Sequence, residues 1–304
     1  MPCGSRDMQD VVEISSYANY VQTSHERPLS GTLYVVATPI GNLEDVSPRV
    51  RQTLAQVDII VAEDTRHTRR LLSHFGIKTP QKALHEHNEE RVVPDIIESL
   101  KNGDSVALVS DAGTPLVSDP GFRLVRSAHV AGVPVSPVPG PSAVTAALSA
   151  AGLPVDRFCF QGFLPAKPVA RRAMLEALAT GPRTMVFFES VHRIRDCVDD
   201  MVQAFGSERR AFIGRELTKL NEQCITASLP ELRAGIMDGS IVSKGEFVVV
   251  VEGGNAQPGS ALDTDRLLSE LVKEMPGKRA AALAARVTGR RRNELYRRIL
   301  ELGC

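Results

Sequence analysis

The sequence predicts an α/β protein with two α/β domains and a small helical module near its C-terminal end. Short apolar strands alternate with helices from Leu33 onward, a second alternating series follows Gly152, and the last part of the chain is helical and basic. Such alternation favours a mainly parallel sheet covered on both faces. The predicted parts are a weakly ordered leader (1–30), an N-terminal α/β domain (31–152), a C-terminal α/β domain (153–254), a linker (255–262) and the helical module (263–304).

Apolar, β-branched runs predict the strands of the N-terminal domain. They lie at Leu33–Thr38, Asp58–Ala62, Ala83–His85, Asp104–Ser110 and Val133–Val138. The helices predicted beside them cover Pro48–Val57, Thr65–Phe75, Glu89–Lys101, Gly121–Ala131 and Ala143–Ala150. The first helix has a clear beginning, because Ser47 can cap it and Pro48 fits its first position.

The same patterns continue after a hinge at Gly152–Pro154, with Phe247–Val251 as the clearest strand. The predicted strands are Arg157–Gln161, Thr184–Phe188, Ala211–Gly214 and Phe247–Val251, and the predicted helices are Arg171–Ala179, Arg193–Phe205 and Pro230–Met237. Three further helices, Thr264–Lys273, Arg279–Val287 and Arg292–Leu302, are expected in the module.

Charge and cysteine usage limit the classes of function. The chain has 36 basic and 36 acidic residues, so any basic surface must be local. From Pro276 to Arg298, eight Lys or Arg stand against one acidic residue, which places a charge of +7 in the helical module. The five cysteines form no C-x-x-C pair, which disfavours zinc and thioredoxin-type sites and agrees with a reducing cytoplasm.

We expect a cytoplasmic protein without a membrane anchor. No apolar run reaches the roughly 18 residues of a transmembrane helix. The polar first 30 residues lack the basic start and apolar stretch of a secretory signal. G-x-G-x-x-G, G-x-x-x-x-G-K-[ST] and G-x-S-x-G are all absent, which weakens dinucleotide, nucleoside triphosphate and serine hydrolase chemistry.

Three loops rich in Gly and Pro follow predicted strands, at Ala37–Ser47, Ser110–Gly121 and Pro137–Ala143. Ligands of open α/β sheets bind at the carboxyl ends of the strands. Gly and Pro allow the backbone to approach a ligand and hold the loop rigid. One such loop often only turns the chain, but three at the same end of one sheet indicate a ligand site.

Six segments together resemble the tetrapyrrole-methylase superfamily, and specifically its ribosomal-RNA branch. They are LYVVATPIGNLEDVS, AEDTRHT, VSDAGTPLVSDPG, PGPSA, FFESVHR and GRELTKLNE, and the resemblance covers about 31–254 and the helical tail. It implies S-adenosylmethionine in a cleft between two α/β domains, a homodimer, and 2′-O-methylation of a cytidine ribose in small-subunit (16S) ribosomal RNA. The porphyrin branch has G-x-G-P-G in its first loop, where this chain has Ala37 and Pro39.

The resemblance also implies a cofactor site. Its predicted residues are Ile40 from the first loop, Ala112, Gly113, Thr114 and Val117 from the second, Ser142 and Ala143 from the third, and Glu189 and Leu217 from the C-terminal domain. The positive sulfonium favours carbonyls or a carboxylate nearby.

Glu63 and Asp64 follow the second strand directly, at the ligand end of the sheet. We hypothesise that one of them accepts the proton of the ribose hydroxyl. Glu63 is the first choice, because its position resembles that of an acidic catalytic residue in the porphyrin branch. The alternative is that both residues cap the next helix, where negative charge is favoured.

Arginine-rich segments are the candidate RNA contacts, because Arg binds phosphate bidentately. In the C-terminal domain Arg215 and Lys219 could hold phosphate or belong to a solvated hairpin. In the module the candidates are Arg290, Arg291, Arg292 and Arg297, in a helix-turn-helix-like arrangement, and the alternative is a solvated basic helix or one packed on an acidic face. His85 and His87 share one strand face, but no third metal ligand is visible, and no metal is expected.

Two other functions remain open from the sequence. One is methylation of a tetrapyrrole or another small molecule on the same fold. The other is a ribosome-assembly factor that binds RNA without catalysis. The altered first loop and the basic tail count against the former, and the intact cofactor loops count against the latter.

Overall fold

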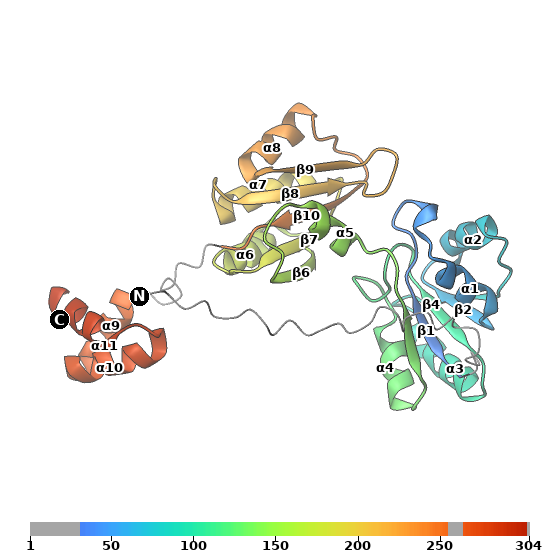
Figure 1. Ribbon diagram of the computed structural model, residues 1–304, viewed down its shortest axis with the longest axis horizontal. Coiled ribbons are helices and arrows are strands. Elements are labelled where there is room, and N and C mark those ends of the chain that lie inside the picture. The colour runs from blue at the N-terminus through green and yellow to red at the C-terminus, as the bar shows by residue number, and fades with distance from the viewer. Residues whose placement is uncertain (1–30, 255–263, 303–304) are drawn as a thin grey trace, which may run out of the picture.

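A five-stranded parallel sheet forms the centre of the N-terminal domain (Figure 1). The computed structural model describes residues 31–254 and 264–302, so the predicted leader and linker lie outside the described residues. The strands run in the order β3 (Gln81–Ala83), β2 (Ile59–Ala62), β4 (Val106–Val109), β1 (Leu33–Val36) and β5 (Val135–Val138). The prediction of a parallel sheet is confirmed for this domain.

Helices cover both faces of this sheet, because neighbouring strand residues point to opposite sides. The helices are α1 (Pro48–Gln56), α2 (Thr65–His74), α3 (Glu89–Lys101) and α4 (Phe122–Val130), with a 3-10 turn η2 at Leu43–Asp45. Ile60 and Ala62 pack with α1 and α2, whereas Val61 packs with α3 and α4. A strand buried on both faces needs a continuous apolar run, which is why these strands were visible in the sequence.

The C-terminal domain has a second five-stranded sheet that is mostly antiparallel. Its order is β6 (Phe158–Phe163), β7 (Thr184–Ser190), β10 (Glu246–Val251), β8 (Arg210–Arg215) and β9 (Gln223–Ser228), and only β6 and β7 pair in parallel. Helices α6 (Pro168–Leu178), α7 (Ile194–Phe205) and α8 (Leu229–Asp238) cover one face. Strand β9 was not predicted, because its partly exposed sequence QCITAS lacks an apolar run.

Helix α5 (Ala143–Ala150) follows the first sheet in the chain but packs on the second sheet. Val144, Ala147 and Leu148 contact Val248 and Val250 of β10. The hydroxyl of Thr226 in β9 also donates to the carbonyl of Ala151, at 2.8 Å. The domain boundary at residue 152 stays a prediction, but the packing shows that α5 joins the two sheets.

The helical module contains α9 (Thr264–Glu274), α10 (Gly277–Thr288) and α11 (Arg292–Glu301). Small and branched side chains form its core: Leu268, Ala280, Ala281, Ala284, Leu295 and Ile299. The three helices were predicted to within a few residues at each end. No helix of the described residues combines the length and apolar composition that crossing a bilayer requires.

The predicted N-cap of helix α1 at Ser47 can be tested directly. Its hydroxyl accepts a hydrogen bond from the amide of Val50 at 3.2 Å, as the predicted N-cap of α1. Ser47→Ala is expected to lower the free energy of unfolding by about 1 kcal/mol and the melting temperature by about 3 °C. The exposed Ser73→Ala, inside α2, is the control in thermal unfolding and should change the melting temperature less; equal losses would contradict the capping role.

Candidate active site

A cavity of about 420 Å³ lies between the ligand end of the first sheet and the second sheet. All three Gly- and Pro-rich loops contribute to its walls, and β7, β8 and β10 supply the opposite side. Its volume falls in the range of small-molecule sites, about 300–1,000 Å³. The cavity therefore stands where the sequence placed a ligand site.

The structure brings every predicted cofactor residue into this cavity. The lining includes Ile40, Ala112, Gly113, Thr114, Val117, Ser142, Ala143, Glu189 and Leu217. These residues come from both α/β domains, and the packing of α5 on the second sheet holds the two sides together. Their contact with a cofactor remains a proposal.

Backbone hydrogen bonds hold the three loops against one another. The amide of Thr38 donates to the carbonyl of Gly113 at 2.8 Å, and the reverse bond measures 3.1 Å. The hydroxyl of Thr38 donates to the carbonyl of Ser110 at 3.1 Å, and that of Thr114 donates to Pro141 at 3.3 Å. The loops thus form a preorganised wall rather than three independent turns.

Backbone strain is concentrated at the same place. Among the described residues, the non-glycine residues with positive φ are Leu116 (75°), Ser118 (72°), Glu216 (50°) and Thr218 (65°). All four belong to two loops that line the cavity from opposite domains. Such conformations cost about 1–3 kcal/mol each and gather at ligand sites.

Glu189 supplies a buried carboxylate at the end of β7. The residue is 2% exposed, and its Oε1 accepts a hydrogen bond from the amide of Ser190 at 2.8 Å. Its Oε2 lies 3.2 Å from Nη2 of Arg193 but accepts no well-aligned hydrogen bond. A buried carboxylate with spare hydrogen-bonding capacity fits a cationic sulfonium.

Two further carboxylates, Asp111 and Asp119, line the cavity. Burial raises the pKa of Asp119 to about 6, with a smaller contribution from the charge of Asp111 and an opposing hydrogen bond from Ser110. Burial also raises the pKa of Glu63, followed by the charges of Asp119 and Asp111. Glu63 itself lines neither this cavity nor the second one described below.

Asp64 caps helix α2, which is the alternative role that the sequence left open. Its carboxylate caps α2 by accepting a hydrogen bond from the amide of Arg66 at 2.8 Å, and it pairs with the Arg66 guanidinium at 2.8 Å. Hydrogen bonds from Arg66 hold the pKa of Asp64 far below its ordinary value. A carboxylate held ionised in this way is a poor proton acceptor, so the catalytic prediction for Asp64 is withdrawn.

A second cavity, of about 330 Å³, adjoins the first. The two cavities share Ile40, Asp111, Ala112 and Glu246 as wall residues. The first loop, α2 and Lys219 complete the second cavity. A group bound in one cavity would therefore lie beside a group bound in the other.

The prediction of an RNA contact at Arg215 is wrong. The residue is 6% exposed, and its guanidinium donates to the carbonyls of Lys244 at 2.6 Å and Asn221 at 2.7 Å. These bonds satisfy the loop that follows β8, and the side chain does not face solvent. Lys219 is more accessible, but its ammonium pairs with Glu216 at 2.9 Å and Glu246 at 3.0 Å.

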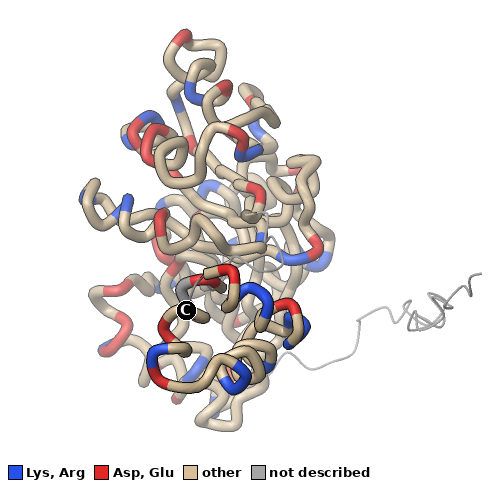
Figure 2. The backbone as a smooth tube through the Cα atoms, turned by 90° about the vertical axis from the view of Figure 1, so that its left-hand side faces the viewer, with Lys and Arg blue, Asp and Glu red and all other residues tan. Residues whose placement is uncertain are grey.

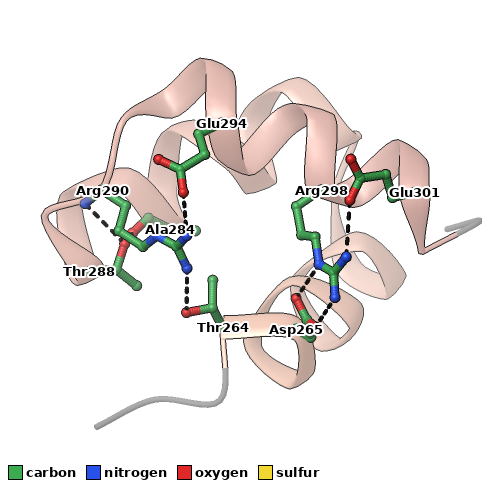
Figure 3. Close-up of polar contacts among 8 residues, drawn as sticks. All are labelled: Thr264, Asp265, Ala284, Thr288, Arg290, Glu294, Arg298 and Glu301. Carbon is green, nitrogen blue, oxygen red and sulfur yellow. Dashed lines mark hydrogen bonds and ion pairs between the residues drawn. The ribbon is translucent and has the colours of Figure 1, made fainter. Parts of the chain in front are cut away.

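The arginines of the helical module fall into two groups. Figure 3 shows Arg290 beside Glu294 and Arg298 between Asp265 and Glu301. The pair of Arg298 with Asp265 connects α11 to α9, whereas the other two pairs lie within α11 or between α11 and the turn before it. Arg291, Arg292 and Arg297 are exposed and form no ion pair with any residue that the structure describes.

Viewed from the side of the helical module, Lys and Arg are interspersed with Asp and Glu along the backbone (Figure 2). The rings of His85 and His87 lie 6.0 Å apart, and within residues 31–254 and 264–302 no group of three metal-ligating side chains forms.

Three wall residues were not predicted from the sequence: Asp119 and the aromatic residues Phe163 and Phe188. Asp119 stands in the S-D-P-G end of a loop already singled out, so its carboxylate could have been named. Phe163 lies beyond Gln161, where the prediction of β6 ended. Both phenylalanines lie at the ligand end of β6 and β7, and their rings are 5.7 Å apart.

Solved structures share this fold. Cobalt precorrin-4 methyltransferase matches with a TM-score of 0.55 and 16% identity, over 73% of this chain and 95% of that one. The methyltransferase CobJ matches with a TM-score of 0.55 and 22% identity, over 74% and 95% of the two chains. At these identities the likeness concerns the fold alone.

Sequence comparison identifies the family. The family described as Tetrapyrrole (Corrin/Porphyrin) Methylases matches residues 32–233, and the chain belongs to this family of S-adenosylmethionine-dependent methyltransferases. A second family, described as the RsmI C-terminal HTH domain, matches residues 258–303. The chain is thus a methyltransferase with an added helix-turn-helix module.

Relatives resemble the chain over nearly its whole length. A protein of Xylella fastidiosa (strain Temecula1) named ribosomal RNA small subunit methyltransferase I is 53% identical over 88% of this chain and 98% of its own. Proteins with the same name from Pseudomonas aeruginosa and Escherichia coli O157:H7 are 51% and 50% identical, over 90% and 89% of this chain and 98% and 95% of their own.

Proposed function

We propose that the protein transfers a methyl group from S-adenosylmethionine to small-subunit ribosomal RNA, at the 2′-oxygen of a cytidine ribose. The observation that carries this is the convergence of nine predicted cofactor residues on one cavity between two domains. The names of relatives about half identical to this chain support RNA as the acceptor. The nucleotide and the oxygen atom rest on the resemblance stated above.

The chemistry asked of the protein is positioning and removal of one proton. When bound, S-adenosylmethionine supplies an electrophilic methyl group on a sulfonium. A bond forms from ribose oxygen to the methyl carbon as the carbon–sulfur bond breaks, and the thioether leaves with the electron pair. Alignment of oxygen, carbon and sulfur can supply several kcal/mol.

In this proposal Glu189 and the backbone of the second loop hold the donor, and the strained loops fix its orientation. Asp119 accepts the hydroxyl proton, because it lines the cavity and has a pKa near neutrality. Asp111 lies at the wall shared by the two cavities. Glu63 lines neither cavity, and the charges of Asp119 and Asp111 contribute to raising its own pKa.

Incubation with isotope-labelled S-adenosylmethionine tests the reaction. Small ribosomal subunits from cells that lack the enzyme should accept label, and mapping should place it on one cytidine 2′-oxygen. Porphyrin, offered in parallel, should accept none. Label on porphyrin alone, or stoichiometric binding to subunits without transfer, would refute the proposal.

The helical module is proposed to bind the ribosomal RNA through Arg291, Arg292 and Arg297, with Arg290 assigned to the fold of the module instead. Deleting residues 263–304 should weaken subunit binding at least tenfold and leave cofactor affinity unchanged. Salt titrations of the two proteins should show a shallower slope after deletion. Equal subunit affinity at moderate salt would contradict the role.

We further propose that the protein is a homodimer and is located in the cytoplasm.

A further inference from the structure

The second cavity has no role in the functions described so far. It lies on the far side of Ile40 and Asp111 from the cofactor cavity, and helix α2 forms one of its walls. His67, Thr68 and Arg70 enter this wall from α2, and Lys219 enters from the C-terminal domain. A cavity that shares one wall with the cofactor cavity and has its remaining walls elsewhere suits the acceptor of the reaction.

Thr68 shows that this wall is built for a ligand. The residue is 2% exposed, and its Oγ1 is buried without a hydrogen-bond partner among the described residues. Most buried hydroxyl groups in folded proteins are hydrogen-bonded, because an unpaired one costs about 1–3 kcal/mol. A ligand hydroxyl or phosphate oxygen in the cavity would supply the missing partner.

The charged side chains of the second cavity suit a phosphate group at one end and a sugar hydroxyl at the other. His67 and Arg70 are exposed and form no ion pair within the described part of the chain, so both can turn toward an anion. Lys219 is already paired with Glu216 and Glu246. The carboxylate of Asp111 lies instead at the wall shared with the cofactor cavity, where a neutral sugar hydroxyl is preferable to a phosphate.

We infer that the second cavity binds the phosphate and ribose of the acceptor nucleotide. Arg70, with His67, holds the phosphate by charge-assisted hydrogen bonds, and Thr68 Oγ1 holds an oxygen of the same nucleotide. The ribose then lies at Asp111, with its hydroxyl toward the cofactor cavity. This inference rests on the proposed function, since it names the place of the acceptor in the same reaction.

Arg70→Ala tests the phosphate contact, with Arg69→Ala as the matched control. Arg69 is the neighbouring exposed residue on α2, lines neither cavity, and carries the same charge. Arg70→Ala should raise the KM for small subunits about tenfold and leave the Kd for S-adenosylmethionine unchanged, whereas Arg69→Ala should change both by less than twofold. Equal effects of the two variants would overturn the inference and leave the proposed function standing.

Thr68→Val separates a ligand contact from a structural role. Valine keeps the volume and removes only an oxygen that has no hydrogen-bond partner in the described part of the chain, so the melting temperature should stay equal or rise. The KM for small subunits should still increase several-fold. A lower melting temperature with an unchanged KM would assign Thr68 to the fold and overturn its part in the site.

Cytidine 3′,5′-bisphosphate is a probe that does not depend on ribosomal RNA being the acceptor. With the demethylated cofactor present, calorimetry at millimolar probe should detect binding to the wild type and to Arg69→Ala, but not to Arg70→Ala. If subunits accept no methyl group while this pattern holds, the proposed RNA substrate fails and the nucleotide site stands. No binding to the wild type overturns the site.

Discussion

Replacing Asp119 by asparagine is expected to slow methyl transfer at least 100-fold and to leave S-adenosylmethionine affinity within about threefold. A positioned general base contributes about 10²–10⁴-fold, and an amide cannot accept the ribose proton. Asp119 lines the cofactor cavity, and its pKa of about 6 keeps it mostly ionised at pH 7. Single-turnover rates on small subunits and calorimetry with the cofactor measure the two quantities separately.

The pH dependence of kcat/KM tests the role of Asp119 as proton acceptor in a second way. Below about pH 6 the wild-type kcat/KM should fall about tenfold per pH unit, because the acceptor must be unprotonated. Above pH 7 it should be level. The Asp119→Asn enzyme should lack this limb, and a limb that persists in it would assign the titration to another group.

The free energy of unfolding should depend on pH in the opposite sense to kcat/KM, because it should fall as pH rises. A carboxyl group whose pKa is raised in the folded protein binds its proton more tightly there than in the unfolded chain. The folded state therefore loses stability as pH rises from about 4 through about 6, and Asp119→Asn removes this loss. After allowance for solvent screening, the free energy of unfolding of Asp119→Asn should exceed that of the wild type by about 1 kcal/mol at pH 7.5 and should equal it at pH 4.

Glu63→Gln is the matched control for the acceptor. Glu63 lines neither cavity, although burial and the charges of Asp119 and Asp111 raise its pKa as well. Its neutral replacement should slow transfer less than tenfold and leave the acid limb in place, because Asp119 remains to accept the proton. A Glu63→Gln enzyme as slow as Asp119→Asn would return the acceptor role to Glu63.

The cofactor cavity could be predicted because its walls are local features of the sequence. Thr38, Gly113 and Ser142 each lie in a loop that follows a predicted strand, and the carboxyl ends of parallel strands must meet at one edge. The order of the strands was not needed for this conclusion. Glu189 and Leu217 came from the family resemblance, since nothing local marks them as cavity residues.

Other roles depend on contacts across long sequence separations and could not be predicted. Arg215 lies in a charged segment that suggests solvent, yet the carbonyl of Lys244, 29 positions away, turns its guanidinium inward. Thr68 looks like an ordinary helical residue in TRHTRRLL. Only the three-dimensional structure shows that its hydroxyl is buried without a partner among residues 31–254 and 264–302.

The topology of the second sheet could not be predicted from the sequence either. Strand–helix alternation predicts parallel pairing, but after β8 the chain returns directly along β9 as an antiparallel neighbour. The sharp return is made by residues 216–222, whose charged sequence gives no strand or helix signal. Glu216 and Thr218 take positive φ there, and this strained return brings Leu217 to the cavity.

The same strained return makes Gly41 a position that tolerates no added side chain. A Cβ on Gly41 would lie 2.4 Å from Cγ of Lys219, 2.8 Å from Oγ1 of Thr218 and 3.0 Å from the carbonyl oxygen of Leu217. The carbonyl belongs to backbone that has little freedom to yield. Added volume must therefore push the first loop away from the C-terminal domain, and with it the neighbouring Ile40.

Gly41→Ala is accordingly expected to lower kcat/KM about 100-fold, since a displacement of about 1 Å between reacting groups has that effect. Cofactor affinity should fall with it, because Ile40 and Leu217 both line the cofactor cavity. Gly277→Ala is the control, as its added Cβ would meet Ile299 and Tyr296 at ordinary distances of 3.5 and 3.7 Å.

A double variant shows whether the close approach is the cause. Lys219→Ala removes the atom nearest to the new methyl group but leaves the Leu217 carbonyl in place. Gly41→Ala with Lys219→Ala should therefore recover part, not all, of the rate lost in Gly41→Ala. Two contacting residues that interact in this way give non-additive effects in a double-mutant cycle. Strictly additive effects would mean that the two domains do not need to meet at Gly41 for catalysis.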